Sequence, residues 1–474
     1  MKMRNSNNRY MQAILFVSVL AITVSCKKSN PILAQTLTPI TPPTQKTNQN
    51  FSKIYYVGNG SADLTIDGNA TAFLANSLIV VNAGTYQTIS IKNLNNETIQ
   101  NGNGAVIMDG TSNVNAGIIF SNCTNVTITR NPAISIDYPF GFICQNNTYR
   151  PTTITGVNKN VVFEYLSYKN IGDYAITVTD NKLKVWDGTD ASLQGQHLKF
   201  SYCKFDNCNE LVFNLEGAVS KSSVTGLQKQ FEVGFCTFLN CNGGDLCFGN
   251  AVDQYNVHDN YFNNINSTNN NDNGLFHMVG NGDFYQNYAV NYQGHLIRMW
   301  TISFGKIPEN CLIYNNISFG SRKYSPFEWQ STEGLNVVVA PNTTFSNIKL
   351  NNNTAGNLNT SKTLTFDACL VDNYSMPIGS TQEVYNNLLY NSFAGNGPSN
   401  RFFQWSSTAE EIQLTKFGNK YFANANTAGF DETKLVLTTN SLAKNAGISG
   451  HLINPLDFHK LPFIVSNPSI GAVQ

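Results

Sequence analysis

The chain has 474 residues, of which 41% are hydrophobic and only 13% are charged, whereas about 25% of the residues of ordinary soluble domains are charged. The 30 basic residues are balanced by 30 acidic ones, so the sequence lacks the basic excess that is typical of nucleic-acid binding. We therefore expect no nucleic-acid partner, and we expect Asn, Ser, Thr and Gly to form many turns.

The first 26 residues predict an export signal. Lys2, Arg4 and Arg9 precede the apolar stretch MQAILFVSVLAITV, which is too short to cross a bilayer comfortably. The next residues, SCKKSN, resemble the processing site of bacterial lipoproteins, with Thr23 where leucine is usual. This resemblance implies that Cys26 is lipidated, and a cleaved secretory signal without a lipid is the alternative.

Residues 27–50 are rich in Pro and Thr and show no hydrophobic period, which predicts a tether. We expect an exported protein that its lipid holds in the outer membrane, facing either the periplasm or the cell surface. No acidic run of the kind that often marks surface export follows Cys26. The remaining residues, 51–474, are expected to form one domain of a monomeric protein.

From residue 51 onward the chain repeats itself at irregular intervals, which excludes helical repeats of fixed length. The clearest copies are FEYLSYKN from Phe163, FSYCKFDN from Phe200, VGFCTFLN from Val233, VHDNYFNN from Val257 and VYNNLLYN from Val384. Each copy has an apolar residue five positions after its start and Asn seven positions after it. The apolar column is Tyr168, Phe205, Phe238, Phe262 and Leu389, and the Asn column is Asn170, Asn207, Asn240, Asn264 and Asn391.

These columns predict a stack of coils. In a parallel solenoid, equivalent side chains lie about 4.8 Å apart, so aromatic residues stack inside and Asn residues form ladders at turns that need a left-handed residue. The chain resembles the pectate-lyase-like superfamily, and its start, IYYVGNG, and its end, NPSIGAVQ, are similar to the first coils and the closing strand of that superfamily. The resemblance implies an all-β protein, a single right-handed parallel β-helix with an N-terminal cap.

Cysteines occupy matching positions of two repeats, with Cys203 over Cys236 and Cys208 over Cys241. The spacing of stacked strands is compatible with disulfides, and an exported protein could oxidise these pairs. Ladders of buried thiols are the alternative, and both remain open at this point.

A second strand follows each repeat start and carries a polar column. The segments are LVFNLE from Leu211, DLCFGN from Asp245, GLFHMVG from Gly274, GHLIRMW from Gly294, PFEWQ from Pro326 and RFFQW from Arg401. If the apolar residues point inward, the outward column contains Asn214, His277, Arg298, Glu328 and Gln404.

Two interpretations of this column remain open. Arg298 and Glu328 could form an ordinary cross-strand ion pair, worth about 0.2–1 kcal/mol. The column could instead belong to a face that binds an anionic sugar chain, because Trp300 would share that face and nearby loops carry cations. The substrate-binding residues predicted on this face are Asn214, Trp300, Lys306, Arg322, Lys323 and Gln404.

Distances narrow the reaction that such a face would catalyse. Glycoside hydrolysis needs two carboxyl groups about 5–9.5 Å apart, but the alignment puts Glu216 and Glu328 four coils, or roughly 19 Å, apart, and shows no cluster of aspartates. β-Elimination from a uronic acid needs a base and a cation for the charge that develops. We therefore predict a catalytic row with His277 as base and Arg298 as charge neutraliser, beside Glu328.

Calcium could assist through Glu328 or Asn214, but the stretch NNNDNG from Asn269 lacks the acidic ligands of a strong calcium loop and is more typical of a turn insertion. No zinc motif is evident. Two classes of function remain. One is a polysaccharide lyase, or an epimerase, acting on a uronate-containing glycan, and the other is a non-catalytic lipoprotein that holds a glycan or another surface partner on the same face.

Overall fold

The computed structural model describes residues 50–474 except for residues 112, 180–183, 191–194, 221, 306, 332–345, 364–368, 375–379, 393–401 and 406–413. Cys26, the predicted lipidation site, lies outside the described residues. The helices of the described part are the short η1 (Pro132–Ile134) and α2 (Ala425–Ala428). Neither is long and apolar enough to cross a membrane.

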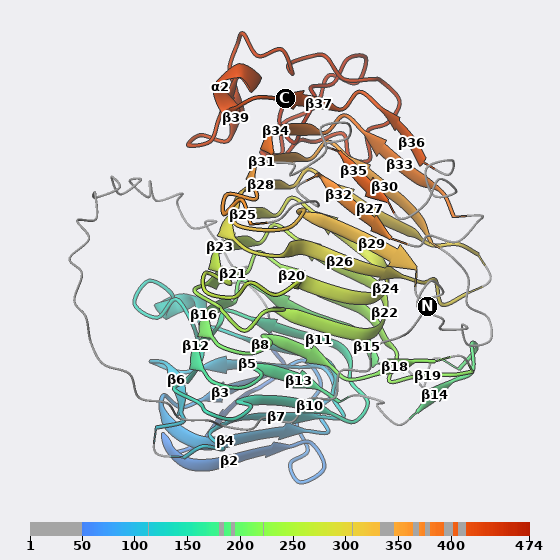
Figure 1. Ribbon diagram of the computed structural model, residues 1–474. Coiled ribbons are helices and arrows are strands. Elements are labelled where there is room, and N and C mark those ends of the chain that lie inside the picture. The colour runs from blue at the N-terminus through green and yellow to red at the C-terminus, as the bar shows by residue number, and fades with distance from the viewer. Residues whose placement is uncertain are drawn as a thin grey trace, which may run out of the picture. The chain divides into compact units, whose positions relative to one another are not determined.

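Each coil contributes strands that pair in parallel with the equivalent strands of neighbouring coils. We call the three resulting stacks row A, row B and row C, in the order in which the chain passes through them. Figure 1 shows the coils stacked from β1 and β2 at the blue end to β36 and β37 at the red end. The fold is therefore the single right-handed parallel β-helix that the sequence repeats predict.

Row A consists of β1 (Ile54–Val57), β3 (Ser77–Val81), β5 (Glu97–Asn101), β8 (Thr124–Thr129), β11 (Lys159–Glu164), β15 (Gly195–Ser201), β20 (Gln228–Gly234), β27 (Asn310–Tyr314), β30 (Asn347–Asn351), β33 (Gln382–Tyr385) and β36 (Leu414–Phe417). Row B consists of β6 (Val106–Asp109), β9 (Phe142–Gln145), β12 (Leu166–Ile171), β16 (Lys204–Cys208), β21 (Thr237–Leu239), β23 (Tyr261–Ile265), β25 (Tyr288–Tyr292), β28 (Ile317–Ser321), β31 (Thr354–Leu358), β34 (Leu388–Ser392) and β37 (Lys420–Phe422). Row C consists of β7 (Gly117–Ser121), β10 (Thr152–Thr155), β13 (Ile176–Val178), β17 (Phe213–Leu215), β26 (His295–Thr301), β29 (Phe327–Ser331), β32 (Val371–Tyr374) and β35 (Phe403–Trp405).

Long strands join two rows without an intervening loop. Strands β2 (Ser61–Asp67) and β4 (Gly84–Lys92) run from row B into row C, and strands β22 (Cys247–His258) and β24 (Gly274–Tyr285) run from row C into row A. β24 changes row at Gly280 and Gly282, where a Cβ atom would collide with the backbone oxygens of Val252 and Tyr255 in β22. Glycine at these two positions therefore allows the close approach of β24 to β22.

Two small antiparallel sheets lie outside the three rows. The first contains β14 (Val185–Trp186), β18 (Ala218–Val219) and β19 (Val224–Thr225), and the second contains β38 (Phe430–Asp431) and β39 (Val436–Leu437).

The predicted aromatic column stacks inside the solenoid. The ring centroids of Tyr168 and Phe205 are 5.1 Å apart, those of Phe205 and Phe238 5.0 Å, and those of Phe238 and Phe262 4.9 Å, with nearly parallel planes. All four side chains are fully buried. The repeat alignment is therefore confirmed at this column, and Leu389 is buried as well.

The predicted Asn column lies at a turn with left-handed backbone. Asn170, Asn207, Asn240 and Asn264 have φ angles of 55–58°, a region that Asn tolerates better than most residues. Side-chain amides hydrogen-bond between coils along this column, as between Asn264 and Asn240 at 2.8 Å, except that Asn240 donates to Asp206 beside Asn207. The next member is Asn291, which donates to Asn264. Phe284 lies opposite the repeat start Val257, so this looser repeat starts one residue before the predicted Tyr285 and keeps the seven-residue distance to its Asn.

A second ladder of amides lies at the corner between rows A and B and is buried except at its last member, Asn419. The side-chain nitrogen of each residue donates to the side-chain oxygen of the next, in the order Asn260, Asn287, Asn316, Asn353, Asn387 and Asn419. Their oxygens also accept the backbone N–H groups of the preceding members. This ladder satisfies polar groups that would otherwise be costly to bury.

The described cysteines are all free and buried. Cys203 and Cys236 each direct their thiol towards the backbone carbonyl two residues earlier. Thus the structure has thiol ladders at these positions rather than disulfides.

Candidate functional site

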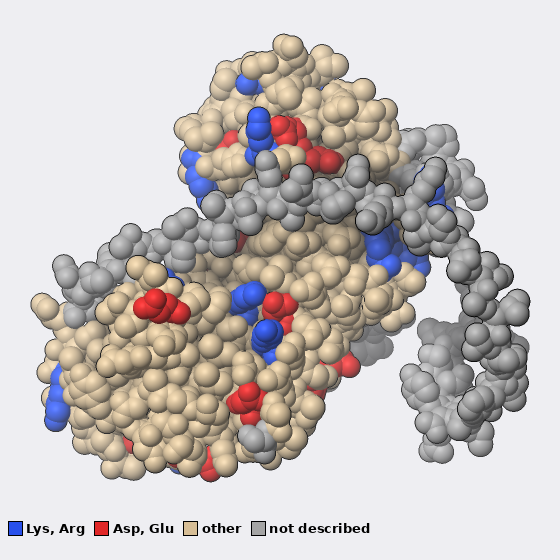
Figure 2. Space-filling view, turned by 90° about the vertical axis from the view of Figure 1, so that its left-hand side faces the viewer, with Lys and Arg blue, Asp and Glu red and all other residues tan. Residues whose placement is uncertain are grey.

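Charge is rare on the surface of this protein. On the side shown in Figure 2, Lys, Arg, Asp and Glu side chains are few and are separated by broad uncharged areas. Row C is different, because five charged or titratable side chains gather on its strands and on the loop beside them. We call this group the row C cluster, and it consists of Asp272, His295, Arg298, Glu328 and Asp372.

The backbone register places the predicted column on consecutive strands of row C. His277 in β24 lies opposite Arg298 in β26, and Arg298 lies opposite Glu328 in β29. The predicted register of these three residues is therefore confirmed. In chain order, the whole column contains Asn214, Phe248, His277, Arg298, Glu328, Asp372 and Gln404.

Arg298 is held by carboxylates from two sides. Its Nε donates to Oε1 of Glu328 at 2.6 Å, and its Nη2 donates to Oδ2 of Asp272 at 2.9 Å. Its Nη1 donates to the backbone oxygen of Asp272 at 3.1 Å. Glu328 is 4% exposed, so the contact is a largely buried ion pair and not the surface pair that one interpretation of the sequence expected.

His295 completes the link between the same two carboxylates. It is fully buried, and its Nε2 lies 2.9 Å from Oε2 of Glu328 and 3.2 Å from Oδ1 of Asp272. Strand β26 thus supplies both cations, and the loop before β24 supplies Asp272. Two positive and two negative groups are brought together, which compensates the cost of burying each charge alone.

The pKa values follow from this arrangement. Burial acts to lower the pKa of His295, but Glu328 and Asp272 raise it to about 10. Burial likewise opposes ionisation of Asp272 and Glu328, but His295 and Arg298 hold the pKa of Asp272 at about 2 and that of Glu328 below its ordinary value. At neutral pH all four groups are therefore charged.

Asp372 differs from its neighbours. It lies one strand beyond Glu328 in the same column and is partly exposed. Burial raises its pKa to about 6, with Glu328 and Asp272 adding to the rise and His295 and Arg298 opposing it. A carboxyl group with such a pKa can take and release protons near neutral pH.

His277 lies between two aromatic rings. The ring centroids of Phe248 and Trp300 are each 4.6 Å from that of His277, and Nδ1 of His277 is 3.5 Å from a carboxylate oxygen of Asp245. Its Nε2 is buried and has no hydrogen-bond partner among the described residues. Trp300 is thus on the predicted outer face, where it packs on the predicted base.

The predicted substrate-binding cations contact the loop that carries Asp272. Arg322 donates to the backbone oxygens of Asn266 and Asn269 at 2.6 Å, and Lys323 donates to that of Asn270 at 3.2 Å. Both contacts help to hold this loop over row C. Asn214 is largely buried, whereas Lys306 and the side chain of Gln404 lie outside the described residues.

Asp272, His295 and Glu328 could hold a metal ion, because their ligand atoms lie within 4.8 Å of one another. This set of donors does not fit calcium, which takes six to eight oxygen ligands, because one ligand is an imidazole and Arg298 already occupies both carboxylates. An imidazole with carboxylates suits a transition-metal ion better. Such an ion would need to displace the proton of His295.

Three members of the row C cluster were not predicted from the sequence. Asp272 comes from the stretch interpreted as a turn insertion, and His295 has the inward parity of its strand. Asp372 lies in the segment LVDNY. This segment begins with two apolar residues, as a buried strand would, and places an aspartate at the position equivalent to Glu328. Within this group, only Asp372 is an aspartate on a strand of row C, and the group gains its second aspartate, Asp272, from a loop that the column alignment does not contain.

No protein-family profile and no curated protein sequence matches this chain. Among solved structures, the pectate lyase Pel9A aligns with 89% of this chain and 96% of its own, at 13% identity and a TM-score of 0.40. A PL6-family alginate lyase, AlyGC, aligns with 75% of this chain and 50% of its own, at 13% identity and a TM-score of 0.36. Another PL6 alginate lyase, in complex with a trisaccharide, covers 87% of this chain and 95% of its own, at 9% identity and a TM-score of 0.34.

Proposed function

We propose that the outer face of row C binds a uronate-containing polysaccharide and cleaves it by β-elimination. The observation that carries this proposal is the position of Asp372, whose pKa is raised to about 6, one strand from the Glu328 that Arg298 and His295 hold. It combines a proton acceptor suited to neutral pH with fixed positive charge nearby.

In this proposal, Asp372 takes the proton from the carbon beside the uronate carboxylate. The electrons of that C–H bond form the new carbon–carbon double bond, the glycosidic C–O bond breaks, and the leaving oxygen receives the proton that Asp372 has taken. Arg298, whose side chain is 17% exposed, remains charged and favours the negative charge that develops on the uronate, while the buried His295 balances the charge of Glu328 and Asp272. The role of His277 as base stays a prediction, and its buried Nε2 makes Asp372 the better candidate.

Glycoside hydrolysis is a second candidate, favoured by a specific pair. Glu328 and Asp372 are on adjacent strands, and their environments shift their pKa values in opposite directions. Such a pair suits an ionised carboxylate and a protonated acid that act on one glycosidic bond. The strand spacing of about 4.8 Å is close to the separation used by retaining enzymes.

The test is to incubate the protein with polygalacturonate, alginate and other polyuronates, and to measure both ultraviolet absorbance and reducing ends. Elimination raises both signals because it creates an unsaturated uronate, whereas hydrolysis raises reducing ends alone. Asp372→Asn should abolish cleavage, and Glu383→Gln in row A serves as a matched control. Binding without cleavage in the unmodified protein would favour the non-catalytic alternative.

We also propose that the mature protein is a lipoprotein of the outer membrane, anchored through Cys26. The support is the sequence alone, with its apolar stretch before SCKKSN and its Pro- and Thr-rich tether. Labelling cells with a tagged fatty acid should mark the protein, and Cys26→Ala should remove the label. A labelled Cys26→Ala protein would contradict the assignment of the anchor.

A further inference from the structure

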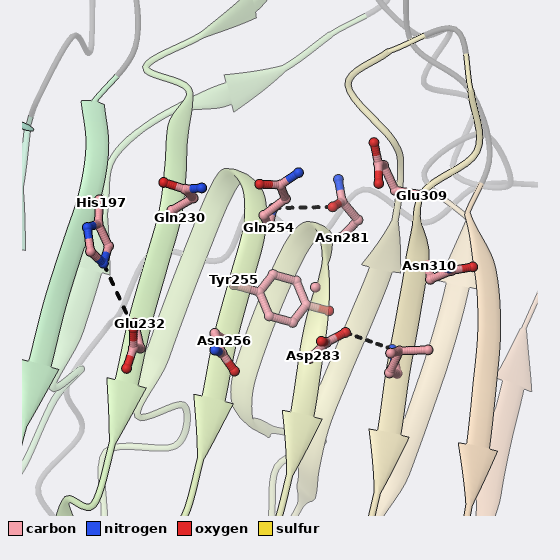
Figure 3. Close-up of a pocket in the computed structure, with 12 residues that line it drawn as sticks. His197, Gln230, Glu232, Gln254, Tyr255, Asn256, Asn281, Asp283, Glu309 and Asn310 are labelled. Atoms are coloured by element: carbon pink, nitrogen blue, oxygen red, sulfur yellow. Dashed lines mark hydrogen bonds and ion pairs between the residues drawn. The ribbon is translucent and has the colours of Figure 1, made fainter. Parts of the chain in front are cut away.

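A second hollow lies on row A, away from the row C cluster. It has a volume of about 540 Å³, and strands β15, β20, β22, β24 and β27 contribute its lining. Figure 3 shows that polar side chains project from these strands in two lines that cross the strands. The first line contains Gln230, Gln254, Asn281 and Asn310, and the second contains Glu232, Asn256 and Asp283.

Three of the four amides of the first line are available to a ligand, whereas that of Asn281 is buried and hydrogen-bonded to Asp253 and Ile302. Gln230, Gln254 and Asn310 are exposed, and none of the residues that the structure describes hydrogen-bonds to their side chains. Each comes from a different strand, and neighbouring strands are about 4.8 Å apart. This spacing is similar to the length of one sugar residue in an extended glycan, so a chain lying along the solenoid axis would meet exposed amides on β20, β22 and β27.

The second line adds carboxylates. Burial acts to raise the pKa of Glu232, but His258 and Lys199 hold it at about 2, with Nζ of Lys199 at 2.8 Å from the carboxylate. Burial raises the pKa of Asp283 to about 6, because its one hydrogen bond from a described residue is a long one from the backbone of Leu312. A partly exposed carboxyl group with few partners can accept hydrogen bonds from sugar hydroxyls.

The charge of this hollow favours an uncharged ligand. Glu232, Asp283 and Glu309 line it, and Lys199 compensates only Glu232. A polyuronate chain would be repelled by the remaining carboxylates. Amides and carboxylates together offer donors and acceptors for hydroxyl groups, which are the polar groups of a neutral glycan.

An adjoining hollow of about 420 Å³ shares Gln230 and adds an aromatic wall. Trp186 and Phe304 line it, with ring centroids 5.9 Å apart. Trp186 is 5% exposed, and its indole N–H is buried without a hydrogen-bond partner in the described part of the chain. Both rings are mostly buried and pack edge to face in a small apolar cluster, so they give this hollow an apolar floor beside its polar lining.

We propose that these two joined hollows, the row A trough, bind a neutral polysaccharide at a site separate from the row C cluster. The glycan lies across the strands, with the amides of Gln230, Gln254 and Asn310 and the carboxylate of Asp283 hydrogen-bonded to its hydroxyls. This proposal does not depend on catalysis in row C, because no residue is shared between the two sites.

Isothermal titration calorimetry of the whole protein with soluble glucan, xylan, mannan and polygalacturonate tests the proposal. We expect at least one neutral glycan to bind. Gln254→Ala and Asn310→Ala should each weaken that binding by roughly 2- to 10-fold, the effect of losing one hydrogen bond. Both side chains are exposed, so the variants should fold normally. Gln87→Ala, at an exposed position in β4, is the matched control and should bind like the unmodified protein.

Asp372→Asn separates the two sites. It should leave neutral-glycan binding unchanged even where it abolishes polyuronate cleavage, so failure of one proposal is distinguishable from failure of the other. The row A trough is not a glycan site if no neutral glycan binds, or if the Gln254 and Asn310 variants bind as tightly as the control. If the unmodified protein binds calcium, Asp283→Asn does not, and no glycan binds, the row A trough is a cation site and not a sugar site.

Discussion

Arg298 and Glu328 lie opposite each other on adjacent strands of row C, with Nε of Arg298 2.6 Å from Oε1 of Glu328. Their side chains are only 17% and 5% exposed, and both also contact a second partner of opposite charge. The pair is therefore the centre of a compensated network, and removing either member leaves the others buried with unbalanced charge.

Replacing Arg298 by alanine should thus destabilise the protein by about 3–5 kcal/mol, the typical cost of breaking a buried ion pair. Urea denaturation measures this loss. Lys349→Ala is the matched control, because Lys349 and Glu383 form a more exposed pair at 3.4 Å, and it should cost less than about 1 kcal/mol. Equal losses of unfolding free energy for both variants would show that the row C pair contributes no more to stability than an exposed ion pair.

Stability should also depend on pH through His295. Its pKa in the folded protein is about 10, whereas an unfolded histidine has a pKa of about 6.5. The folded state therefore binds this proton more tightly, and the stabilisation is complete below about pH 6.5 and is lost as the pH rises towards 10. The His295→Gln variant lacks this stabilisation. The difference in unfolding free energy between the variant and the unmodified protein should therefore shrink as the pH rises from about 6.5 to about 10. A difference that stays constant would contradict a charged His295.

The pH dependence of cleavage distinguishes the two roles of Asp372. As a base for elimination, Asp372 must be ionised, so the rate should rise with pH up to about 6 and then level off. As the acid of a hydrolase it must be protonated, and the rate should fall above about pH 6. Asp372→Asn should lower either activity by roughly 10²–10⁴-fold. Activity that is retained in this variant would transfer the role of base to another residue, with His277 the first to test.

The aromatic ladder predicts a large effect in the core. Phe238 is fully buried between Phe205 and Phe262, so Phe238→Ala should cost about 3–5 kcal/mol. Phe417 is 60% exposed, and Phe417→Ala should cost much less. Thermal and urea unfolding of the two variants compare the same chemical change inside and outside the solenoid.

The buried amide ladder should be similarly sensitive. Asn287 makes hydrogen bonds to Asn260, Asn316 and the backbone oxygen of Val257, and its removal leaves several of these groups unsatisfied. We expect Asn287→Ala to cost about 2–5 kcal/mol, since each buried unsatisfied group costs about 1–3 kcal/mol. The exposed Asn103 provides the control, and Asn103→Ala should change stability by less than about 0.5 kcal/mol.

The fold could be predicted because stacking repeats a local pattern. Tyr168, Phe205, Phe238 and Phe262 keep a constant distance from their repeat starts, and the same periodicity placed His277, Arg298 and Glu328 in register. The buried amide ladder could also have been predicted from the repeats. Asn260 and Asn387 occupy the fourth position of their repeats, which is the position of the buried Cys203 and Cys236 in earlier coils.

The rest of the site depends on features without a period. Asp272 reaches Arg298 from a loop whose length no neighbouring coil shares, and His295 turns towards Glu328 although its strand parity points inward. The coil between Glu328 and Asp372 is long in sequence. The two residues are therefore far apart along the chain although they lie opposite each other on adjacent strands. Contacts of this kind follow from loop conformation, which column alignments do not contain.

The continuous path of β24 from row C to row A limits how this protein can be altered. His277 and Asp283 belong to one strand, and the bend between them requires two glycines packed against the backbone of β22. Engineered insertions at this corner would break strand pairing in both rows, whereas the loop that carries Asp272, between rows B and C, offers a place where added residues need not disturb a strand. We therefore expect that engineering and evolution change the ligand preference of this protein mainly by altering the loops between rows B and C.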